Sequence, residues 1–252
     1  MPISSEHIVK SYDEELHRLK RMIAQMGGLA ESQLESAVDA LVRRDNAAAE
    51  RVVRDDSRID EIDQEVGTQV VRLLALRQPM AQDLREVVGS LKISADLERI
   101  ADYAANIGKR AIALTQVPPV KSLHAIPRMG RLAQEIIKDV LDAYMDRSAD
   151  KAVAAWSRDE EVDEMYNSLF RELLTYMMED PRNISACTHL LFVAKNIERI
   201  GDHATNIAET VYFMATGRPL TGDRPKGDTT SFSVITPGEP GGNQGGQEAS
   251  KT

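Results

Sequence analysis

Pairs of carboxylates spaced four positions apart are the residues in this sequence with the clearest potential for chemistry. One pair lies in the stretch LERIADYAANI, which begins at Leu97, and the chain repeats this stretch one hundred positions later as IERIGDHATNI. The four pairs are Asp56 with Asp60, Glu98 with Asp102, Asp159 with Asp163, and Glu198 with Asp202. On an α-helix, residues four apart lie on one face about 6 Å from each other, where like charges repel. Some feature of the protein must therefore neutralise them.

Metal ions are one means of neutralising these carboxylates. Oxygen-only ligands suit hard cations such as Mg²⁺, Mn²⁺ or Ca²⁺, and also iron. The alternatives are ion pairs with Arg99 and Arg199, or a solvated helix face, and residue spacing alone leaves all three open. Asn106 and Asn206 each follow the last aspartate of a pair by four positions. They are candidates for hydrogen bonds that support metal ligands, and equally for ordinary surface amides.

The helical face that carries Glu98 and Asp102 bears on the choice between metal ions, ion pairs and solvation. At about 100° per residue, Glu98 and Asp102 line up with an apolar series on the same helix. The series consists of Leu84, Val88, Leu91 and Ala95. We therefore expect this pair to continue a face that is shielded from water, where uncompensated carboxylates are unfavourable. The corresponding face of the second half carries Lys195, so the pattern is weaker there.

Glycine, proline and short polar stretches divide the chain into six long helical segments, in two sets of three. The expected segments are residues 6–43, 46–77, 80–115, 122–147, 149–179 and 183–216. Asp45 and Ser148 are the expected N-caps of two of them. Short connections make consecutive helices antiparallel neighbours, so Asp60 and Glu98 should stand at similar heights on adjacent helices.

The two halves of the chain are internal repeats. RIDEI, which begins at Arg58, resembles EVDEM, which begins at Glu161, and ERIAD resembles ERIGD. We predict an all-α fold of two tandem, similar three-helix bundles with a disordered tail, since eight of the 15 glycines and four of the 10 prolines fall in the last 36 residues. The predicted units are a first bundle over residues 5–117, a second bundle over 121–216 and the tail over 217–252.

The composition restricts the class of protein. Hydrophobic residues make up 42% and charged residues 28%, while aromatic residues make up only 4%, which favours helices over a β-sandwich. No apolar run approaches the roughly 20 residues of a membrane helix, and the N-terminal residues have no signal-peptide core. With Cys187 as the single cysteine, we expect a cytoplasmic protein. The net charge of −9 argues against nucleic-acid binding and suits a protein that attracts cations.

Features of enzymes are sparse in the sequence. Paired Glu-x-x-His motifs would indicate a di-iron centre, but only Glu14 and His17 match, once and outside the repeat. No phosphate-binding glycine-rich loop and no nucleophile–base pair is evident. We therefore expect a non-enzymatic protein. A helical scaffold without metal remains one alternative, and a carboxylate di-metal hydrolase or oxidase is a weaker one.

Several motifs together resemble the PhoU family of bacterial phosphate-signalling regulators. They are RQPMAQDLR from Arg77, YMMEDPRNI from Tyr176, and the repeated ERIAD and ERIGD. The resemblance runs from about Tyr12 to Gly217. It implies two three-helix bundles whose acidic pairs bind clusters of metal ions on the helix surface. Mg, Mn, Fe and Zn, as divalent or ferric ions, are not distinguished by it.

The resemblance also implies a regulatory role. Members of the family repress the phosphate-starvation response when phosphate is ample. They act between the ATPase of the high-affinity phosphate transporter, PstB, and the sensor kinase PhoR, so contact with the membrane is through partners only. Several members form homodimers. One departure is Asn196, which stands where the first repeat has Asp96 and removes one acidic group from the second site. The two sites are therefore expected to differ.

Overall fold

The computed structural model describes residues 5–120, 124–221 and 230. The first half contains α1 (Ser5–Arg43), α2 (Asn46–Asp55), α3 (Ser57–Arg77) and α4 (Ala81–Leu114). The second half contains α5 (Ala125–Asp146), α6 (Ala149–Trp156), α7 (Asp159–Glu179), the short 3-10 helix η1 (Pro181–Asn183) and α8 (Ile184–Thr216). No β-strand occurs within the described ranges. In the same ranges, no helix combines the length and apolarity required to cross a membrane.

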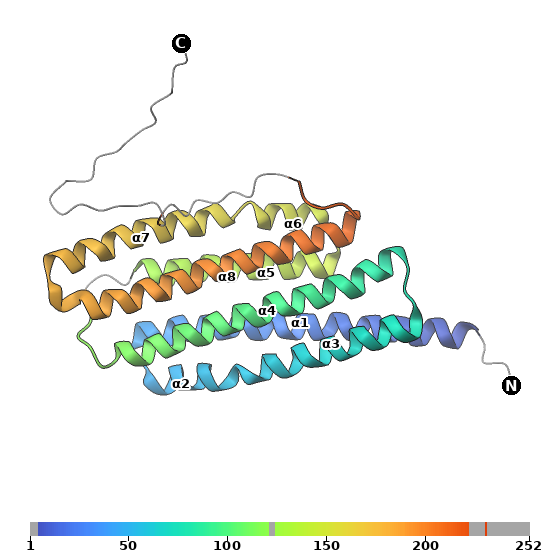
Figure 1. The fold of residues 1–252 in the computed structure, drawn as a ribbon, viewed down its shortest axis with the longest axis horizontal. Helices are drawn as coiled ribbons and strands as arrows, with labels where there is room; N and C mark the ends of the chain where they lie inside the picture. Colours follow the sequence, from blue (N-terminus) through green and yellow to red (C-terminus); the bar gives the residue numbers. More distant parts are fainter. Residues whose placement is uncertain (1–4, 121–123, 222–229, 231–252) are drawn as a thin grey trace, which may run out of the picture.

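Each half forms a three-helix bundle. In the first, α1 and α4 pack with the broken helix made of α2 and α3, and in the second, α5 and α8 pack with α6 and α7 (Figure 1). The prediction of an all-α fold with two similar three-helix bundles is confirmed. Gly217 ends α8 in the left-handed conformation, with φ of 72°. The tail predicted beyond it lies outside the described residues, except for residues 217–221 and 230.

The middle helix of each bundle is broken, whereas the sequence had suggested one continuous segment. The breaks fall at Asp56 and at Ser157 with Arg158. At each break a serine hydroxyl donates back along the chain, Ser57 to the carbonyl of Arg54 and Ser157 to that of Val153. Such bonds compete with the backbone pattern of the helix. As a result, the predicted ligands Asp60 and Asp159 lie in the first turns of α3 and α7.

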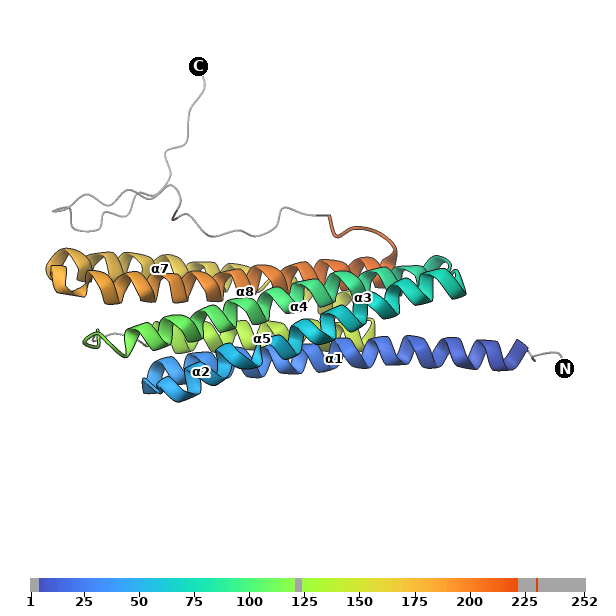
Figure 2. The same ribbon diagram turned by 60° about the horizontal axis from the view of Figure 1, so that its bottom comes forward.

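The two bundles pack side by side through α4 and α8, which run antiparallel (Figures 1 and 2). At one end of this contact Gly89 faces the side chain of Met214, where a Cβ would crowd its sulfur atom. Equivalent apolar residues of the two helices are fully buried, such as Ile100 and Ile200. As a result, the helices that carry Glu98 and Glu198 are direct neighbours.

The apolar series on α4 lies at the surface, so the expectation that it is shielded from water is wrong. Leu84, Val88 and Leu91 are 40%, 36% and 41% exposed. Because α4 contacts α1, α3 and α8 with its other sides, this remaining face meets solvent. Glu98 and Asp102 continue the exposed series toward the middle of the molecule. The acidic pair therefore lies at the edge of the bundle rather than within a dry face.

Candidate metal-binding site

The first acidic surface comprises Asp56, Asp60, Glu98 and Asp102, at the start of α3 and the middle of α4. Asp56 accepts a hydrogen bond at Oδ1 from Nε2 of Gln33, 3.1 Å away on α1. Burial raises the pKa of Asp56, and the negative charges of Asp102 and Asp60 raise it further. Asp102 belongs to α4, so the carboxylates of the two helices are close enough to interact.

Glu98 joins the same group. Burial raises the pKa of Glu98, and the neighbouring charge of Asp102 adds to the effect. The charges of Asp60 and Asp63 on α3 contribute as well, as expected if Asp60 and Glu98 stand at similar heights. The chain therefore assembles one acidic surface from two antiparallel helices.

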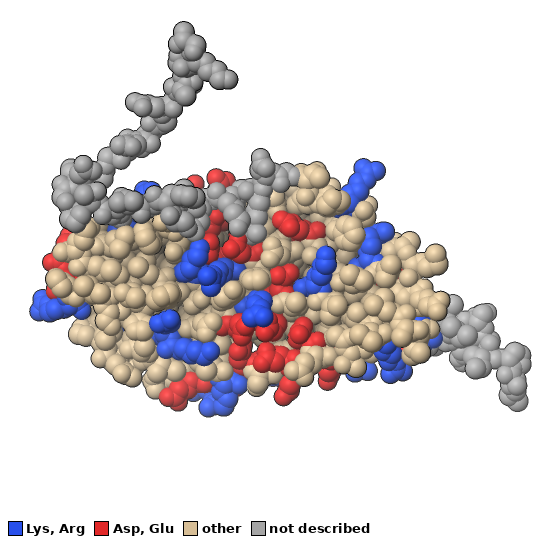
Figure 3. Space-filling model, in the orientation of Figure 1, with Lys and Arg blue, Asp and Glu red and all other residues tan. Residues whose placement is uncertain are grey.

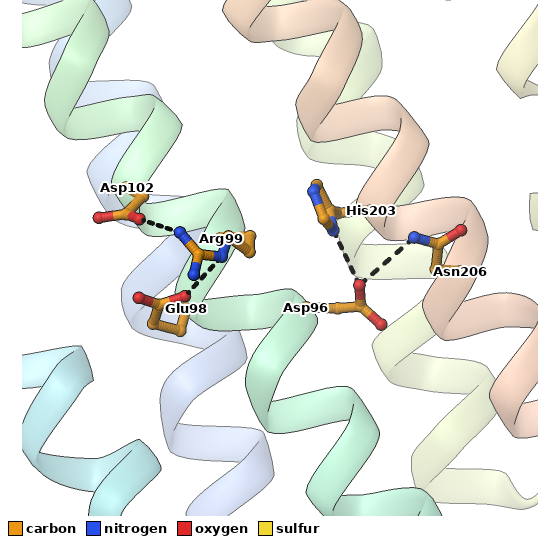
Figure 4. Close-up of polar contacts among 6 residues, drawn as sticks. All are labelled: Asp96, Glu98, Arg99, Asp102, His203 and Asn206. Carbon is orange, nitrogen blue, oxygen red and sulfur yellow. Dashed lines mark hydrogen bonds and ion pairs between the residues drawn. The ribbon is translucent and has the colours of Figure 1, made fainter.

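An arginine spans the α4 pair. Nε of Arg99 lies 3.3 Å from Oε2 of Glu98, and its Nη1 donates to Oδ2 of Asp102 at 3.0 Å (Figure 4). The arginine side chain is 56% exposed. Water screens such a pair, so its stabilising effect is small. Arg99 is therefore an exposed neutralising partner at the rim of the first acidic surface.

The second acidic surface comprises Asp159, Asp163, Glu198 and Asp202, on α7 and α8. The first three of these residues are buried, with relative exposures of 1%, 4% and 5%. The absence of a side chain at Gly201 lets α7 approach, because a Cβ there would lie 3.3 Å from Oδ1 of Asp159. This surface is therefore drier than the first.

Glu198 is a strongly perturbed carboxylate of the second acidic surface. Burial raises its pKa to about 7, with the charges of Asp202 and Asp163 adding to the shift and Lys195 opposing it. Nζ of Lys195 donates to Oε1 of Glu198 at 2.7 Å. Oε2 is buried and meets no hydrogen-bond partner among the described residues. Oε1 of Glu198 thus binds a lysine, whereas Oε2 accepts no hydrogen bond from the described residues.

The residues expected to support the ligands take different positions. Asn106 accepts a hydrogen bond from Lys109 at 3.1 Å. The guanidinium of Arg199 lies over the ring of Tyr103, 5.7 Å from its centre, and so contacts the first bundle. Asn206 also reaches the first bundle, where its Nδ2 donates to Asp96 at 3.4 Å. Arg99 directly contacts both carboxylates of the acidic pair on its own helix.

Asp96 and His203 link the two bundles between the acidic surfaces. Nδ1 of His203 donates to Oδ1 of Asp96 at 2.8 Å, and the same oxygen receives the bond from Asn206 (Figure 4). The side chains of Asp96 and His203 are 17% and 22% exposed. The histidine ring also lies 5.6 Å from that of Tyr103. These contacts join α4 to α8 and so hold the first acidic surface beside the second.

Acidic side chains gather in the middle of the face shown in Figure 3, with lysine and arginine side chains around them. Within the described ranges, no three Asp, Glu, His or Cys side chains converge closely enough to ligate a single ion. The two surfaces therefore present oxygen donors on neighbouring helices without an assembled coordination shell. Metal binding at the eight predicted residues stays a prediction.

Three neighbours of these surfaces were not singled out as site residues from the sequence. Asp63 follows Asp60 by three positions, a spacing that places it on the same helical face. Lys195 precedes Glu198 by three positions, so its contact also had a signal in the helical spacing. Gln33 lies on another helix and 23 positions from Asp56. No local spacing could have indicated that contact.

Comparison with known proteins agrees with the duplicated architecture. The model of the PhoU domain matches the chain twice, at residues 23–111 and 126–211. A relative from Caulobacter vibrioides, named phosphate-specific transport system accessory protein PhoU homolog, is 58% identical over 228 residues, covering 90% of this chain and 99% of the relative. A relative of the same name from Rhizobium meliloti is 54% identical over 230 residues, covering 91% and 97%.

Solved structures agree with these matches. The crystal structure of PhoU from Pseudomonas aeruginosa superposes with a TM-score of 0.79 at 38% identity, covering 82% of this chain and 100% of that one. The phosphate transport system regulatory protein PhoU from Streptococcus pneumoniae gives a TM-score of 0.77 at 29% identity, covering 83% and 99%. With two domain matches and relatives more than half identical over nearly their whole length, this chain belongs to the PhoU family.

Proposed function

We propose that this protein is a cytoplasmic, non-enzymatic regulator of phosphate transport. The observation that carries the proposal is the 58% identity to a relative named as an accessory protein of phosphate-specific transport, which this chain covers over 99% of its length. The finer role is to couple the transporter ATPase PstB to the sensor kinase PhoR. In that role the protein represses phosphate uptake and the phosphate-starvation response when phosphate is ample.

Deletion of the gene tests this role. In phosphate-rich medium, the deletion strain should express alkaline phosphatase at a high level, and the wild-type gene on a plasmid should restore repression. A plasmid that carries an early stop codon is the matched control and should leave expression high. If phosphatase stayed low in the deletion strain, the regulatory role would be wrong.

The second part of the proposal is that both acidic surfaces bind divalent or ferric metal ions, through the eight carboxylates already named. A hard cation would supply positive charge where the helices gather negative charge. Two observations support this. Every donor is a carboxylate oxygen, the type that Mg²⁺, Mn²⁺ and iron accept. In addition, Oε2 of Glu198 is buried without a hydrogen-bond partner among the described residues, which is unfavourable unless a cation compensates it.

Metal-dependent stability tests the surfaces directly. Mn²⁺ added to metal-stripped protein should raise the melting temperature by mass action, because folded protein alone presents the assembled carboxylates. Replacing Glu98 and Asp102 with Ala should remove the response of the first surface and spare the second. Glu61→Ala with Glu65→Ala is the matched control, since these exposed glutamates have the same spacing on α3. If the quadruple variant that also lacks Glu198 and Asp202 kept its metal content, the site assignment would fail.

Arg99 favours one rival for the first surface. Because it contacts both Glu98 and Asp102, an arginine network can neutralise this pair without metal. The protein would then be a helical scaffold, with no metal role at that surface. Elemental analysis of purified protein distinguishes the two, since this rival predicts that the wild type holds no more metal than the variant with Glu98→Ala and Asp102→Ala.

Self-association is the third part of the proposal. Leu84, Val88 and Leu91 form an exposed apolar series on α4, and burying it between two copies would remove apolar area from water. Sedimentation should report a homodimer. Leu84→Ser with Leu91→Ser should shift the protein toward monomer, whereas Leu76→Ser, at an exposed leucine of α3, serves as the control. A wild-type monomer at tens of micromolar, on the order of common assay concentrations, would contradict this.

A further inference from the structure

We infer that Lys195 acts as a built-in counter-cation of the second acidic surface, so that the first acidic surface binds exchangeable metal more tightly. This inference rests on the proposed metal-binding function and assigns unequal roles to its two sites. It concerns a residue that is not among the eight proposed ligands.

The contacts of Lys195 carry the inference. Its Nζ lies 2.7 Å from Oε1 of Glu198, whose side chain is only 6% exposed. The same ammonium lies 5.0 Å from the centre of the Tyr166 ring, at the distance of a cation–π interaction. Lys195 itself is 31% exposed. A glutamate on one side and an aromatic ring on the other therefore hold the ammonium group against the second acidic surface.

The first repeat has a different arrangement at the equivalent positions. Ala95 corresponds to Lys195; it is exposed, and as an alanine it carries no charge. The arginine that neutralises the first pair, Arg99, lies at the rim and is 56% exposed. Its counterpart Arg199 lies over Tyr103 of the first bundle. The first repeat thus has an exposed arginine beside its acidic pair, whereas the second has a lysine beside a buried carboxylate.

An ammonium group at this position competes with a metal ion for the same oxygen. A metal that ligates Oε1 of Glu198 must displace the lysine or bind beside its positive charge, and both raise the free energy of the bound state. Interactions between charges are strongest where water is excluded, and three carboxylates of the second acidic surface are buried. On the first acidic surface, water screens Arg99, which can turn away without leaving a buried charge uncompensated.

Mn²⁺ calorimetry on separated surfaces tests the inference. Glu198→Ala with Asp202→Ala isolates the first surface, and Glu98→Ala with Asp102→Ala isolates the second. We expect the first to bind Mn²⁺ at least about tenfold more tightly, in keeping with the size of close charge interactions. In the background that isolates the second surface, Lys195→Met should tighten Mn²⁺ binding by about tenfold or more, while keeping most of the side-chain stem.

Two further variants complete the experiment. Ala95→Lys, which copies the second repeat into the first, should weaken Mn²⁺ binding to the isolated first surface. Lys195→Arg keeps the positive charge and should leave the second surface weak. Lys92→Ala, at an exposed lysine of α4, is a control for general loss of positive charge. If Lys195→Met failed to fold, Ala95→Lys and the comparison of the two wild-type surfaces would still decide the matter.

The outcomes separate this inference from the proposal beneath it. Equal Mn²⁺ affinities of the two surfaces, unmoved by Lys195→Met, would overturn the role of Lys195 while leaving metal binding intact. The same holds if Lys195→Met lowers the melting temperature in chelator without changing Mn²⁺ affinity, which would mark a structural lysine. A wild-type protein that takes up no Mn²⁺ on either surface would overturn the metal proposal itself, and this inference with it.

Discussion

At the scale of single residues, the two acidic surfaces differ in how far their carboxylates are withdrawn from water. Glu98 is partly exposed, whereas Glu198 is 95% buried, since its relative exposure is 5%. Withdrawal from water disfavours the charged form of a carboxylate, which explains why the larger pKa shift belongs to Glu198. Equivalent positions of a duplicated sequence therefore carry the same residue types with different electrostatic properties.

The raised pKa of Glu198 makes the stability of metal-free protein depend on pH. Its pKa is about 7 in the folded state and near 4.5 in the unfolded state, so folded protein binds the extra proton between these values. The free energy of unfolding should therefore fall as the pH rises from about 4.5 through about 7. Glu198→Gln, which cannot ionise, should remove this part of the decline and stabilise the protein at pH 8 by at most about 3 kcal/mol.

Urea unfolding in chelator, at pH 5 and pH 8, measures the effect of this substitution. The matched control is Glu65→Gln, because Glu65 is exposed on α3 and should leave the pH dependence of the wild type unchanged. Parallel pH profiles for Glu198→Gln and the wild type would show that folding does not raise the pKa of Glu198.

The composition of the acidic pairs could be predicted from the sequence, whereas their partners mostly could not. Residues four apart share a helical face whatever the tertiary structure, so Glu98 and Asp102 were certain to be close once a helix formed. Gln33, which donates to Asp56, comes from a different helix. Its contact depends on how α1 rotates against the rest of the bundle, and local spacing contains no information about that.

At the scale of helices, local signals determined where α2 and α6 begin. Asp45 caps α2, with Oδ1 accepting from the backbone N–H of Ala48 at 2.9 Å, and Ser148 caps α6 with a bond of 3.3 Å from Lys151. Both caps were expected from the sequence. The breaks before α3 and α7 were missed, because a single serine that bonds back to the preceding turn is a weak signal within a strong helical pattern.

Removing the cap of α2 should destabilise the first bundle. Asp45→Ala leaves the first N–H groups of α2 without their side-chain acceptor and should reduce the free energy of unfolding by about 1 kcal/mol. Asp45→Asn keeps a side-chain oxygen at the same place and should retain most of that stability. The measurement is urea unfolding at neutral pH. Equal losses for the two variants would show that charge near the helix start, rather than capping, matters here.

The exposed apolar series of α4 shows where periodicity alone misleads. A row of Leu84, Val88 and Leu91 has the spacing of a buried face, and a second row on the same helix is in fact buried. Periodicity identifies apolar faces without saying which of them meets a neighbour. In this protein α8 approaches α4 from the side where Gly89 meets Met214, and the apolar series is left outside that contact.

At the scale of the whole molecule, α4 and α8 pack antiparallel with α3 and α7 on opposite sides, so the two repeats are arranged about an approximate two-fold axis between α4 and α8 (Figure 1). The equivalent residues Tyr103 and His203 lie against each other across it, with ring centres 5.6 Å apart. Asp96 pairs with His203 on one side of the axis. On the other side the equivalent residues are Asn196 and Tyr103, which supply neither a carboxylate nor an imidazole. The repeats have therefore diverged at both members of one contact, and this divergence favours pairing of α4 with α8 over pairing of either helix with its own copy.

The last prediction is that the contact between Asp96 and His203 couples the two bundles energetically. Asp96→Ala, His203→Ala and the double variant form a double-mutant cycle, and we expect a coupling free energy of about 1 kcal/mol or more at neutral pH in chelator. The physical reason is that both side chains are largely withdrawn from water, so each substitution leaves a polar group of its partner with poor compensation. The control cycle uses Asp146 and Lys151, which are 56% and 53% exposed and should couple by less than about 0.5 kcal/mol. If the two cycles gave the same small coupling, the relative position of the bundles would rest on apolar packing between α4 and α8, and the divergence at these positions would have no energetic consequence.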